Sequence, residues 1–378
     1  MQNLIYLDNG ATTKPFKSSI EYASKYIEEC YFNASSLYGG GVEANIAISE
    51  ARKAVLSAFP KNFEAIFVSC GSEANNMAIN SYLKRGNAVT TLSEHSAVYE
   101  PFTELKNNGY DARFASLNED GSVNVENLLS LIDKNTVFVS VMHVNNETGA
   151  INDINYIAKR VKSINPRVIF HSDGVQAFLK IPYTISNDID LYSISAHKVN
   201  ALKGIGALIK NKRIKNLKPL IYGGGQEGGL RSGTENVFGI KVFESSVLAH
   251  LKTVKQSYEN AKKLKEYCVN NLDKSIFKII SSENCSPYIL SVSAVGLKGE
   301  VLVHMLEKYG IYVGTGSACS SKNRHSRVLK NVGHDGATLD GVLRVSFSLE
   351  TPKVSTRKQD WGMMKKGVKK IKNSFSFS

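Results

Sequence analysis

Short β-branched runs alternate with amphipathic helical patterns from about residue 42 to residue 345. One helical pattern spans Glu43 to Phe59, where alanine, isoleucine and valine recur on a single face. Runs typical of buried strands follow it at Ala65–Ser69, Ala88–Leu92, Val137–Met142, Val168–His171 and Asp190–Ile194. This alternation predicts an α/β protein with a mostly parallel sheet covered by helices on both faces.

A glycine-rich stretch, Gly223–Gly229, precedes a long helical pattern from about Asn236 to Asn271. We place a domain boundary within this pattern, near residues 240–255. Residues 1–250 would then form a large domain and residues 251–378 a smaller C-terminal α/β domain. Strands of the smaller domain are expected at Ile276–Ile280, Ile289–Val292, Ile311–Val313 and Leu343–Phe347. The first 15 residues could pack with either domain.

Composition narrows the class of protein. The 378 residues are 42% hydrophobic and 21% charged, which favours folded domains over disorder. The five cysteines are an odd number without a CxxC pair, so we expect neither a disulfide framework nor a metal site. We expect the protein to work in a reducing compartment. The start lacks a basic segment followed by an apolar core, and no run of 18 apolar residues occurs. We therefore expect a cytoplasmic protein without a membrane anchor.

Polar side chains stand where the expected strands end. Ligands of open α/β sheets bind beyond the carboxyl ends of the strands. Five residues would meet there: Ser72, His95, Asn146, Asp173 and Lys198. The sequence thus predicts one site built from five segments.

Two of these residues suit a pyridoxal phosphate (PLP) cofactor. A shielded lysine such as Lys198 can form a Schiff base with an aldehyde, and a carboxylate such as Asp173 can pair with the pyridinium nitrogen. Taken alone, Lys198 would ordinarily be interpreted as a surface lysine, and Asp173 as a cap or turn residue at a strand end. The stretch Cys70–Glu73, just before a helical run, offers a phosphate cradle, although a simple Ser N-cap has the same pattern.

The glycine-rich stretch Gly223–Gly229 and the residues after it offer weaker signals of a binding site. Arg231–Thr234 is another candidate for contact with an anion. Gly223, Gly225 and Gly228 fit GxGxxG, but no helix opens directly after them, so we interpret the dinucleotide match as coincidence.

Cys319 is the best nucleophile among the cysteines. It lies in a Gly- and Ser-rich stretch near Lys322, Arg324 and Arg327, which favour the thiolate. Cys30, Cys268 and Cys285 lack such neighbours and are interpreted as structural, while Cys70 is expected to line the site passively. Arg344, a charge within an apolar strand, is either a bidentate clamp for a carboxylate or part of a structural salt bridge.

Together these segments resemble the cysteine desulfurases, PLP-dependent enzymes of the aminotransferase class V family. That family has the aspartate aminotransferase-like fold, called fold type I. The matching motifs follow in order along most of the chain: Tyr6–Thr13, Ser72–Asn76, Glu94–Ala97, His143–Gly149, Asp173–Gln176, Ser195–Lys198, Gly316–Cys319 and Arg344–Ser348.

The resemblance implies a set of cofactor contacts. Lys198 would hold PLP as the internal aldimine, Asp173 would pair with the ring nitrogen, and Gln176 would contact the ring hydroxyl. The phosphate would be bound by Gly71, Ser72, Ser195 and His197. Thr234 would reach the phosphate in the partner subunit's site, which would make the homodimer the active unit.

The resemblance also implies the reaction. His95 would stack on the cofactor ring and shuttle protons, and Asn146, at the cofactor, would hold the substrate L-cysteine together with Arg344. The Cys319 thiolate would attack the substrate sulfur, leaving L-alanine and a Cys319 persulfide. The sulfur would pass to an acceptor protein, either an iron–sulfur scaffold or a tRNA thiolation enzyme.

The chain departs from the family pattern near the site entrance. Ala34 and Tyr38 replace a proline and a histidine, and Ala201-Leu202 replaces Gly-Pro after the Schiff-base lysine. A selenocysteine lyase, or another class V enzyme that does not use the cysteine, is the alternative among enzymes. The net charge of +13 raises a further alternative, an RNA-associated sulfur-relay scaffold. We do not expect direct binding of nucleic acid, and interpret this charge as solvated surface or a docking patch for an acidic protein.

Overall fold

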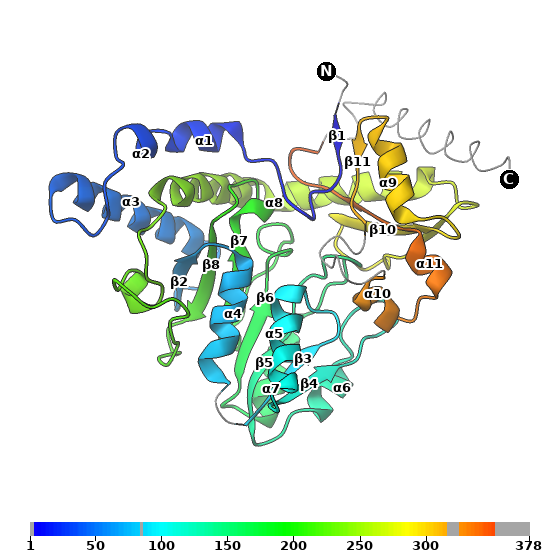
Figure 1. The fold of residues 1–378 in the computed structure, drawn as a ribbon, viewed down its shortest axis with the longest axis horizontal. Helices are drawn as coiled ribbons and strands as arrows, with labels where there is room; N and C mark the ends of the chain where they lie inside the picture. Colours follow the sequence, from blue (N-terminus) through cyan, green and yellow to red (C-terminus); the bar gives the residue numbers. More distant parts are fainter. Residues whose placement is uncertain (1–3, 84–85, 316–324, 352–378) are drawn as a thin grey trace.

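The computed structural model describes residues 4–83, 86–315 and 325–351, and Figure 1 shows a larger and a smaller sheet joined by one long helix. The elements of the first part are β1 (Ile5–Tyr6), α1 (Lys17–Ala23), α2 (Lys25–Glu28), α3 (Gly39–Leu56), β2 (Phe63–Val68), α4 (Gly71–Tyr82), β3 (Asn87–Thr91), α5 (Ser96–Asn107), β4 (Asp111–Ala115), α6 (Val125–Ser130), β5 (Thr136–Ser140), α7 (Ile154–Ile164), β6 (Ile169–Asp173), β7 (Leu191–Ser195) and β8 (Gly206–Asn211). The rest of the chain forms α8 (Val237–Asn271), β9 (Phe277–Ile279), β10 (Ile289–Ala294), α9 (Gly299–Glu307), β11 (Ile311–Tyr312), α10 (Arg327–Asn331), α11 (Gly336–Asp340) and β12 (Val342–Ser346).

The larger sheet carries the strand ends that the sequence singled out. Within the described residues it has seven strands, in the order β2-β8-β7-β6-β5-β3-β4. The strands from β3 to β7 run parallel, whereas β8 is antiparallel to both β7 and β2. The predicted mostly parallel sheet is confirmed. The antiparallel β8 was not predicted. Its direction follows from the turn between β7 and β8, which reverses the chain and contains Gly204, whose φ of +83° suits glycine.

Helices cover the larger sheet on both faces because its strands alternate their apolar side chains. One face packs against α3, α7 and the first half of α8, with Phe67, Phe170 and Ile209 pointing into that core. The other face packs against α4 and α5, with Ile66 and Phe138 pointing into it. This burial on both faces explains why the strands read as continuous apolar runs.

The smaller sheet has a core of its own. It contains β9, β10 and β12 and packs with α9 and the second half of α8. Along α8, the side chains up to Val247 join the first core, and those from Ala261 join the second. The boundary at residues 240–255 stays a prediction, which this change of core supports.

The N-terminal segment packs with both parts of the molecule. Strand β1 pairs in parallel with β11, and Leu7 lies in the core of the smaller sheet (Figure 1). Further along, Thr13 N donates to His197 O and Phe16 N donates to Asn200 O on the larger part. The segment between them, around Gly10, therefore crosses the junction of the two sheets.

The predicted elements agree with the structure to within a few residues, and two of the differences have visible causes. Helix α3 begins at Gly39 rather than Glu43, because three glycines and Val42 form its first turn ahead of the amphipathic pattern. Strand β5 ends at Ser140 rather than Met142, because Met142 N leaves the ladder to donate to Glu94 Oε1 (2.7 Å). No helix in the described part of the chain is long and apolar enough to cross a membrane.

Candidate active site

Asp173, at the carboxyl end of β6, is a buried carboxylate with two fixed donors. Asn75 Nδ2 on α4 donates to Oδ2 at 2.7 Å, and the backbone N–H of Val175 donates to Oδ1 at 2.9 Å. Only 4% of Asp173 is exposed. The two hydrogen bonds set the direction in which the carboxylate can meet a further cationic group.

Lys198 lies in a short 3-10 turn, Ala196–Lys198, that follows β7 directly. Its Nζ donates to the backbone oxygens of Gly10 (2.5 Å) and Ala11 (2.7 Å). Gln176 Nε2 donates to the same oxygen of Gly10 at 2.8 Å. The N-terminal segment thus supplies acceptors that hold the lysine and the glutamine at the mouth of the sheet.

His95 caps the N-terminus of α5 and lies within electrostatic reach of three predicted site residues. Its Nδ1 accepts a hydrogen bond from Ala97 N at 3.1 Å, so a neutral ring carries its proton on Nε2. Burial lowers the His95 pKa; Asp173 opposes this effect, and the cations Lys198 and Arg344 add to it. His95 is therefore neutral at pH 7 and can give its Nε2 proton or accept one through the ring.

Gly71, Ser72 and Ser195 form a cradle at the start of α4. A Cβ on Gly71 would lie 3.5 Å from Ser195 Cβ, so the helix start and the end of β7 lie side by side. Ser195 is 3% exposed, and its hydroxyl finds no hydrogen-bond partner among the described residues. Ser72 is exposed in the first turn of this 12-residue helix. An unpartnered hydroxyl beside a helix N-terminus fits an anionic group such as a phosphate.

His197 stands beside this cradle as a neutral side chain. Its Nδ1 lies 3.1 Å from Thr12 Oγ1. Burial, with contributions from Lys198 and Lys180, lowers the His197 pKa to about 4. The ring therefore offers a neutral N–H at pH 7 rather than a second fixed cation.

Arg344 forms a salt bridge within the chain, one of the two roles that its sequence position suggested, and the clamp for a carboxylate stays a prediction. Its Nη2 donates to Asp8 Oδ1 at 2.9 Å, and its Nη1 donates to the backbone oxygen of Asn146 at 3.0 Å. Its Nε is buried and finds no partner among the described residues. The salt bridge to Asp8 fixes the guanidinium, and the remaining donor can meet a further acceptor.

Cys319 lies outside the described residues, but the chain on either side of it is attached to the site. On one side, Gly314 N donates to Arg344 O (3.0 Å), and Arg344 N donates back to Gly314 O (2.7 Å). On the other side, the Ser326 hydroxyl donates to Glu147, and Arg327 donates to the backbone oxygens of Leu92 and Glu94. Both ends of the segment with Cys319 are therefore anchored close to Arg344 and to the turn that carries His95.

Comparison with known proteins agrees with this geometry. The aminotransferase class-V family model matches residues 5–354. A cysteine desulfurase of Nostoc sp. is 35% identical over 355 residues, covering 91% of this chain and 88% of that protein. A solved structure titled NIFS-LIKE PROTEIN superposes with a TM-score of 0.88 at 31% identity, covering 99% of this chain and all of that one. A structure titled "SspA in complex with cysteine" has a TM-score of 0.79 at 27% identity, covering 93% of this chain and all of that one.

The chain belongs to the cysteine desulfurases of the aminotransferase class-V family. The family, its fold type I architecture, the enzymatic class and the cofactor PLP, all expected from sequence, are thereby confirmed. The described residues fit PLP: the unpartnered Ser195 hydroxyl suits its phosphate, Asp173 its ring nitrogen and the Lys198 amine its aldehyde.

Thr234 and Arg231 are not joined to these residues. Thr234 is exposed and lines a small pocket of about 140 Å³ together with Ser69. Arg231 Nε donates to Glu73 Oε1 at 3.0 Å, so its charge is taken up by a carboxylate within the chain. The suggested anion contact of the Arg231–Thr234 stretch stays a prediction. The glycine-rich stretch forms a loop, and α8 begins only at Val237, so it is not a dinucleotide motif.

The other cysteines differ in part from expectation. Burial raises the thiol pKa of Cys30 and of Cys268, consistent with inert structural roles. Cys70 caps α4, its Sγ accepting from Glu73 N. Cys285 was expected to lack basic neighbours, which is wrong: Lys265 Nζ lies against its sulfur. Lys265 stands 20 residues earlier in the chain, a separation at which no local pattern predicts a contact.

Several residues that shape the site were missed from the sequence. Asn75 orients Asp173, and Asp8 fixes Arg344. Glu94 is almost fully buried, which raises its pKa to about 8, and its Oε1 accepts from Met142 N and Thr91 Oγ1. Arg327, which the sequence suggested as a cation near Cys319, lies over the Tyr99 ring, 3.6 Å from its centroid, a contact that was not predicted. Asn75 left a local signal of its contact, as a polar residue on the buried face of α4.

Proposed function

We propose that this chain converts L-cysteine to L-alanine and takes the released sulfur onto Cys319 as a persulfide. The observation that carries the proposal is the double anchoring of the Cys319 segment, at Arg344 on one side and at the His95 turn on the other. This attachment places the described residues on both sides of that segment beside the residues proposed to hold and protonate the substrate. The comparison structure titled in complex with cysteine supports the choice of substrate.

The cofactor would be held by residues of both the larger sheet and the N-terminal segment. Lys198 would bind its aldehyde through Nζ, Asp173 would face the ring nitrogen, and Gln176 would face the ring hydroxyl. Gly71, Ser72, Ser195 and His197 would hold the phosphate. When bound, PLP supplies an electron-withdrawing ring that stabilises negative charge on the substrate α-carbon.

The substrate would be oriented by Arg344 and Asn146. The Arg344 Nε is a donor available to a substrate carboxylate, since it has no partner among the described residues, while Nη1 and Nη2 donate to the Asn146 carbonyl and to Asp8, respectively. Lys198, once displaced, would hold the proton taken from the α-carbon. His95, neutral at pH 7, would stack on the ring and pass protons through Nε2.

The sulfur transfer needs no external oxidant, because its atoms and electrons balance between L-cysteine and the Cys319 thiol. The Cys319 thiolate attacks the substrate sulfur, forming an S–S bond as the bond between that sulfur and the substrate β-carbon breaks. The electron pair of the broken bond stays on carbon, which takes up a proton, so L-cysteine and the thiol become L-alanine and a persulfide. Gly314, at the base of the segment, offers little bulk to hinder such an approach.

Comparing substrates tests this assignment against its nearest alternative. The purified holoenzyme is incubated with L-cysteine, with L-selenocysteine, or with an amino acid and oxo acid pair. We expect alanine and an equal amount of reductant-released sulfide from L-cysteine, and no amino-group exchange with the pair. Turnover of L-selenocysteine alone would instead identify a selenocysteine lyase.

We predict that Arg344→Lys raises KM for L-cysteine by about 10- to 100-fold, since it loses a charge-assisted hydrogen bond to the substrate carboxylate. The lysine keeps a positive charge for Asp8, so the fold should survive. Steady-state kinetics give KM and kcat separately, and kcat should change less. Arg113→Lys is the control and should leave KM unchanged. Arg113 lies on β4 and pairs with Asp111 and Asp133. An unaltered KM in Arg344→Lys would remove Arg344 from the substrate site.

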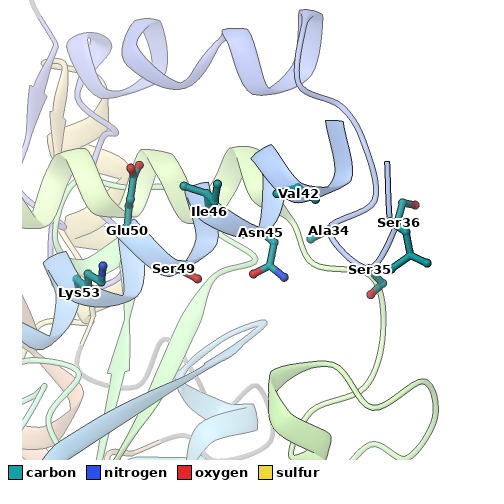
Figure 2. A pocket seen from close by; sticks show the side chains of 10 residues that line it. Ala34, Ser35, Ser36, Val42, Asn45, Ile46, Ser49, Glu50 and Lys53 are labelled. Atoms are coloured by element: carbon teal, nitrogen blue, oxygen red, sulfur yellow. The ribbon is translucent and has the colours of Figure 1, made fainter. Parts of the chain in front are cut away.

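The homodimer is proposed as the active unit, and an uncovered face of α3 with exposed apolar side chains supports it. A groove of about 480 Å³ runs between α3 and residues 34–37, and Figure 2 shows Val42 and Ile46 among its side chains. Leu37, at 97% exposure, projects beside it. Arg52 on α3 donates to Glu227, which ties the loop leading to Thr234 to the same region. A second copy on this face would bring Thr234 to the neighbouring phosphate cradle.

The acceptor would be a protein of iron–sulfur cluster assembly or of tRNA thiolation. Free thiols on the four cysteines within the described residues support a reducing, cytoplasmic setting. The surplus of 13 positive charges suits docking of an acidic acceptor.

A further inference from the structure

Three hydrogen bonds connect Lys180 to Lys198. Lys180 Nζ donates to Gln176 Oε1 at 2.9 Å, and Gln176 Nε2 donates to the backbone oxygen of Gly10 at 2.8 Å. Lys198 Nζ donates to that same oxygen at 2.5 Å. Lys180 has no place in the reaction described above, yet it lies at the far end of this chain of contacts.

The two partners of Gln176 determine which way its amide points. The Gly10 carbonyl can only accept, so it requires the amide nitrogen, and the Lys180 amine donates, so it requires the amide oxygen. The amide is then fixed from both ends. One N–H of Nε2 is used on Gly10, and the other remains for a further acceptor in the site.

Lys180 is placed here in spite of an unfavourable environment. It is 5% exposed, and no carboxylate of the described residues forms an ion pair with it. The charges of Lys198 and Arg344 influence the pKa of Lys180. Lys180 in turn influences the pKa of His197 and His250, and none of these four groups is acidic. Burial and the two cations lower its pKa to about 7. An unpaired buried lysine is costly, so a purely structural filling of this space would favour an apolar side chain.

We propose that Lys180 is a positioning residue that holds the Gln176 amide with its nitrogen toward the ring hydroxyl of PLP. This inference rests on the proposed function, in which Gln176 faces that hydroxyl. A donated hydrogen bond stabilises the ionised ring oxygen. The ring oxygen is then a weaker base toward the proton that it shares with the cofactor-bound nitrogen of Lys198. That proton therefore dissociates at a lower pH.

The test is a pH titration of the visible absorbance band of the holoenzyme without substrate. We expect Lys180→Met to raise the midpoint of this titration by about one pH unit, because the amide can then rotate and the donor is lost. Gln176→Ala should raise it by a similar amount. The double variant should shift no further than either single variant, since both changes remove the same hydrogen bond.

Controls separate this role from charge and from folding. Lys180→Arg keeps the donor and should keep the wild-type midpoint. Lys210→Met removes another buried lysine, on β8, whose Nζ donates to Ile214 O, and should also leave the midpoint unchanged. Lys180→Leu, a second donor-free variant, serves if the methionine variant does not fold.

Three outcomes would overturn the inference. A wild-type midpoint in the donor-free Lys180 variants, or in Gln176→Ala, would mean that no such hydrogen bond is lost. Additive shifts in the double variant would mean that Lys180 acts on Lys198 directly by its charge. Failure of the wild-type enzyme to bind PLP through Lys198 would overturn the proposed function as well, and is seen before any variant is made.

Discussion

Lys198→Ala is expected to abolish covalent attachment of PLP and to lower the rate of alanine formation by about four orders of magnitude or more. Lys198 Nζ is held by the carbonyl oxygens of Gly10 and Ala11 at the mouth of the sheet, where the proposed cofactor and substrate meet. Its amine serves twice, as the attachment point for the aldehyde and as the holder of the α-proton. Borohydride reduction followed by peptide mass analysis shows whether PLP is fixed to residue 198.

Lys203→Ala is the matched control for this prediction. Lys203 is an exposed lysine five residues further along, on the turn between β7 and β8. We expect it to keep both the attached cofactor and the rate within a few-fold of wild type. Covalent PLP at another lysine in the Lys198 variant would contradict the assignment of the site.

Cys319→Ala is expected to prevent persulfide formation while leaving PLP bound. The reason is that the thiolate is the only group of the proposed mechanism able to accept the substrate sulfur, and removing a nucleophile costs about a thousandfold or more in rate. The visible band should be unchanged, because Ser195 and Asp173, which are proposed to contact PLP, lie at the ends of β7 and β6 and keep their own positions in the larger sheet. Alanine release and cofactor content are measured in the same sample.

Cys285→Ser tests the specificity of that effect. Cys285 is buried, and the Lys265 amine lies against its sulfur, so it is a cysteine with a basic neighbour outside the proposed site. We expect its replacement to leave sulfur transfer intact. Unchanged sulfur release from Cys319→Ala, or its loss in Cys285→Ser, would require a different nucleophile.

The position of the site could be predicted because it follows from local patterns. Asp173 is the last residue of β6, His95 and Lys198 follow shortly after β3 and β7, and parallel strands bring their carboxyl ends to one edge. The cradle at Gly71 and Ser72 likewise needs only a strand followed by a helix start. These features depend on neighbours within a few residues of each side chain.

The orienting contacts could not be predicted because they join distant segments. Asn75 and Asp173 are 98 residues apart, and Asp8 and Arg344 are 336 apart. The network through Lys180 depends on the N-terminal segment crossing the junction of the two sheets to present Gly10. The assignment of Thr234 to the phosphate depends on the proposed second copy.

The most direct test of the central claim is to find the sulfur on the protein. The holoenzyme is mixed with one equivalent of L-cysteine, persulfides are trapped by alkylation, and the labelled peptide is identified by mass spectrometry while alanine is quantified. We expect one added sulfur on Cys319 for each alanine formed. Alanine without sulfur on Cys319, or sulfur on another cysteine, would contradict it.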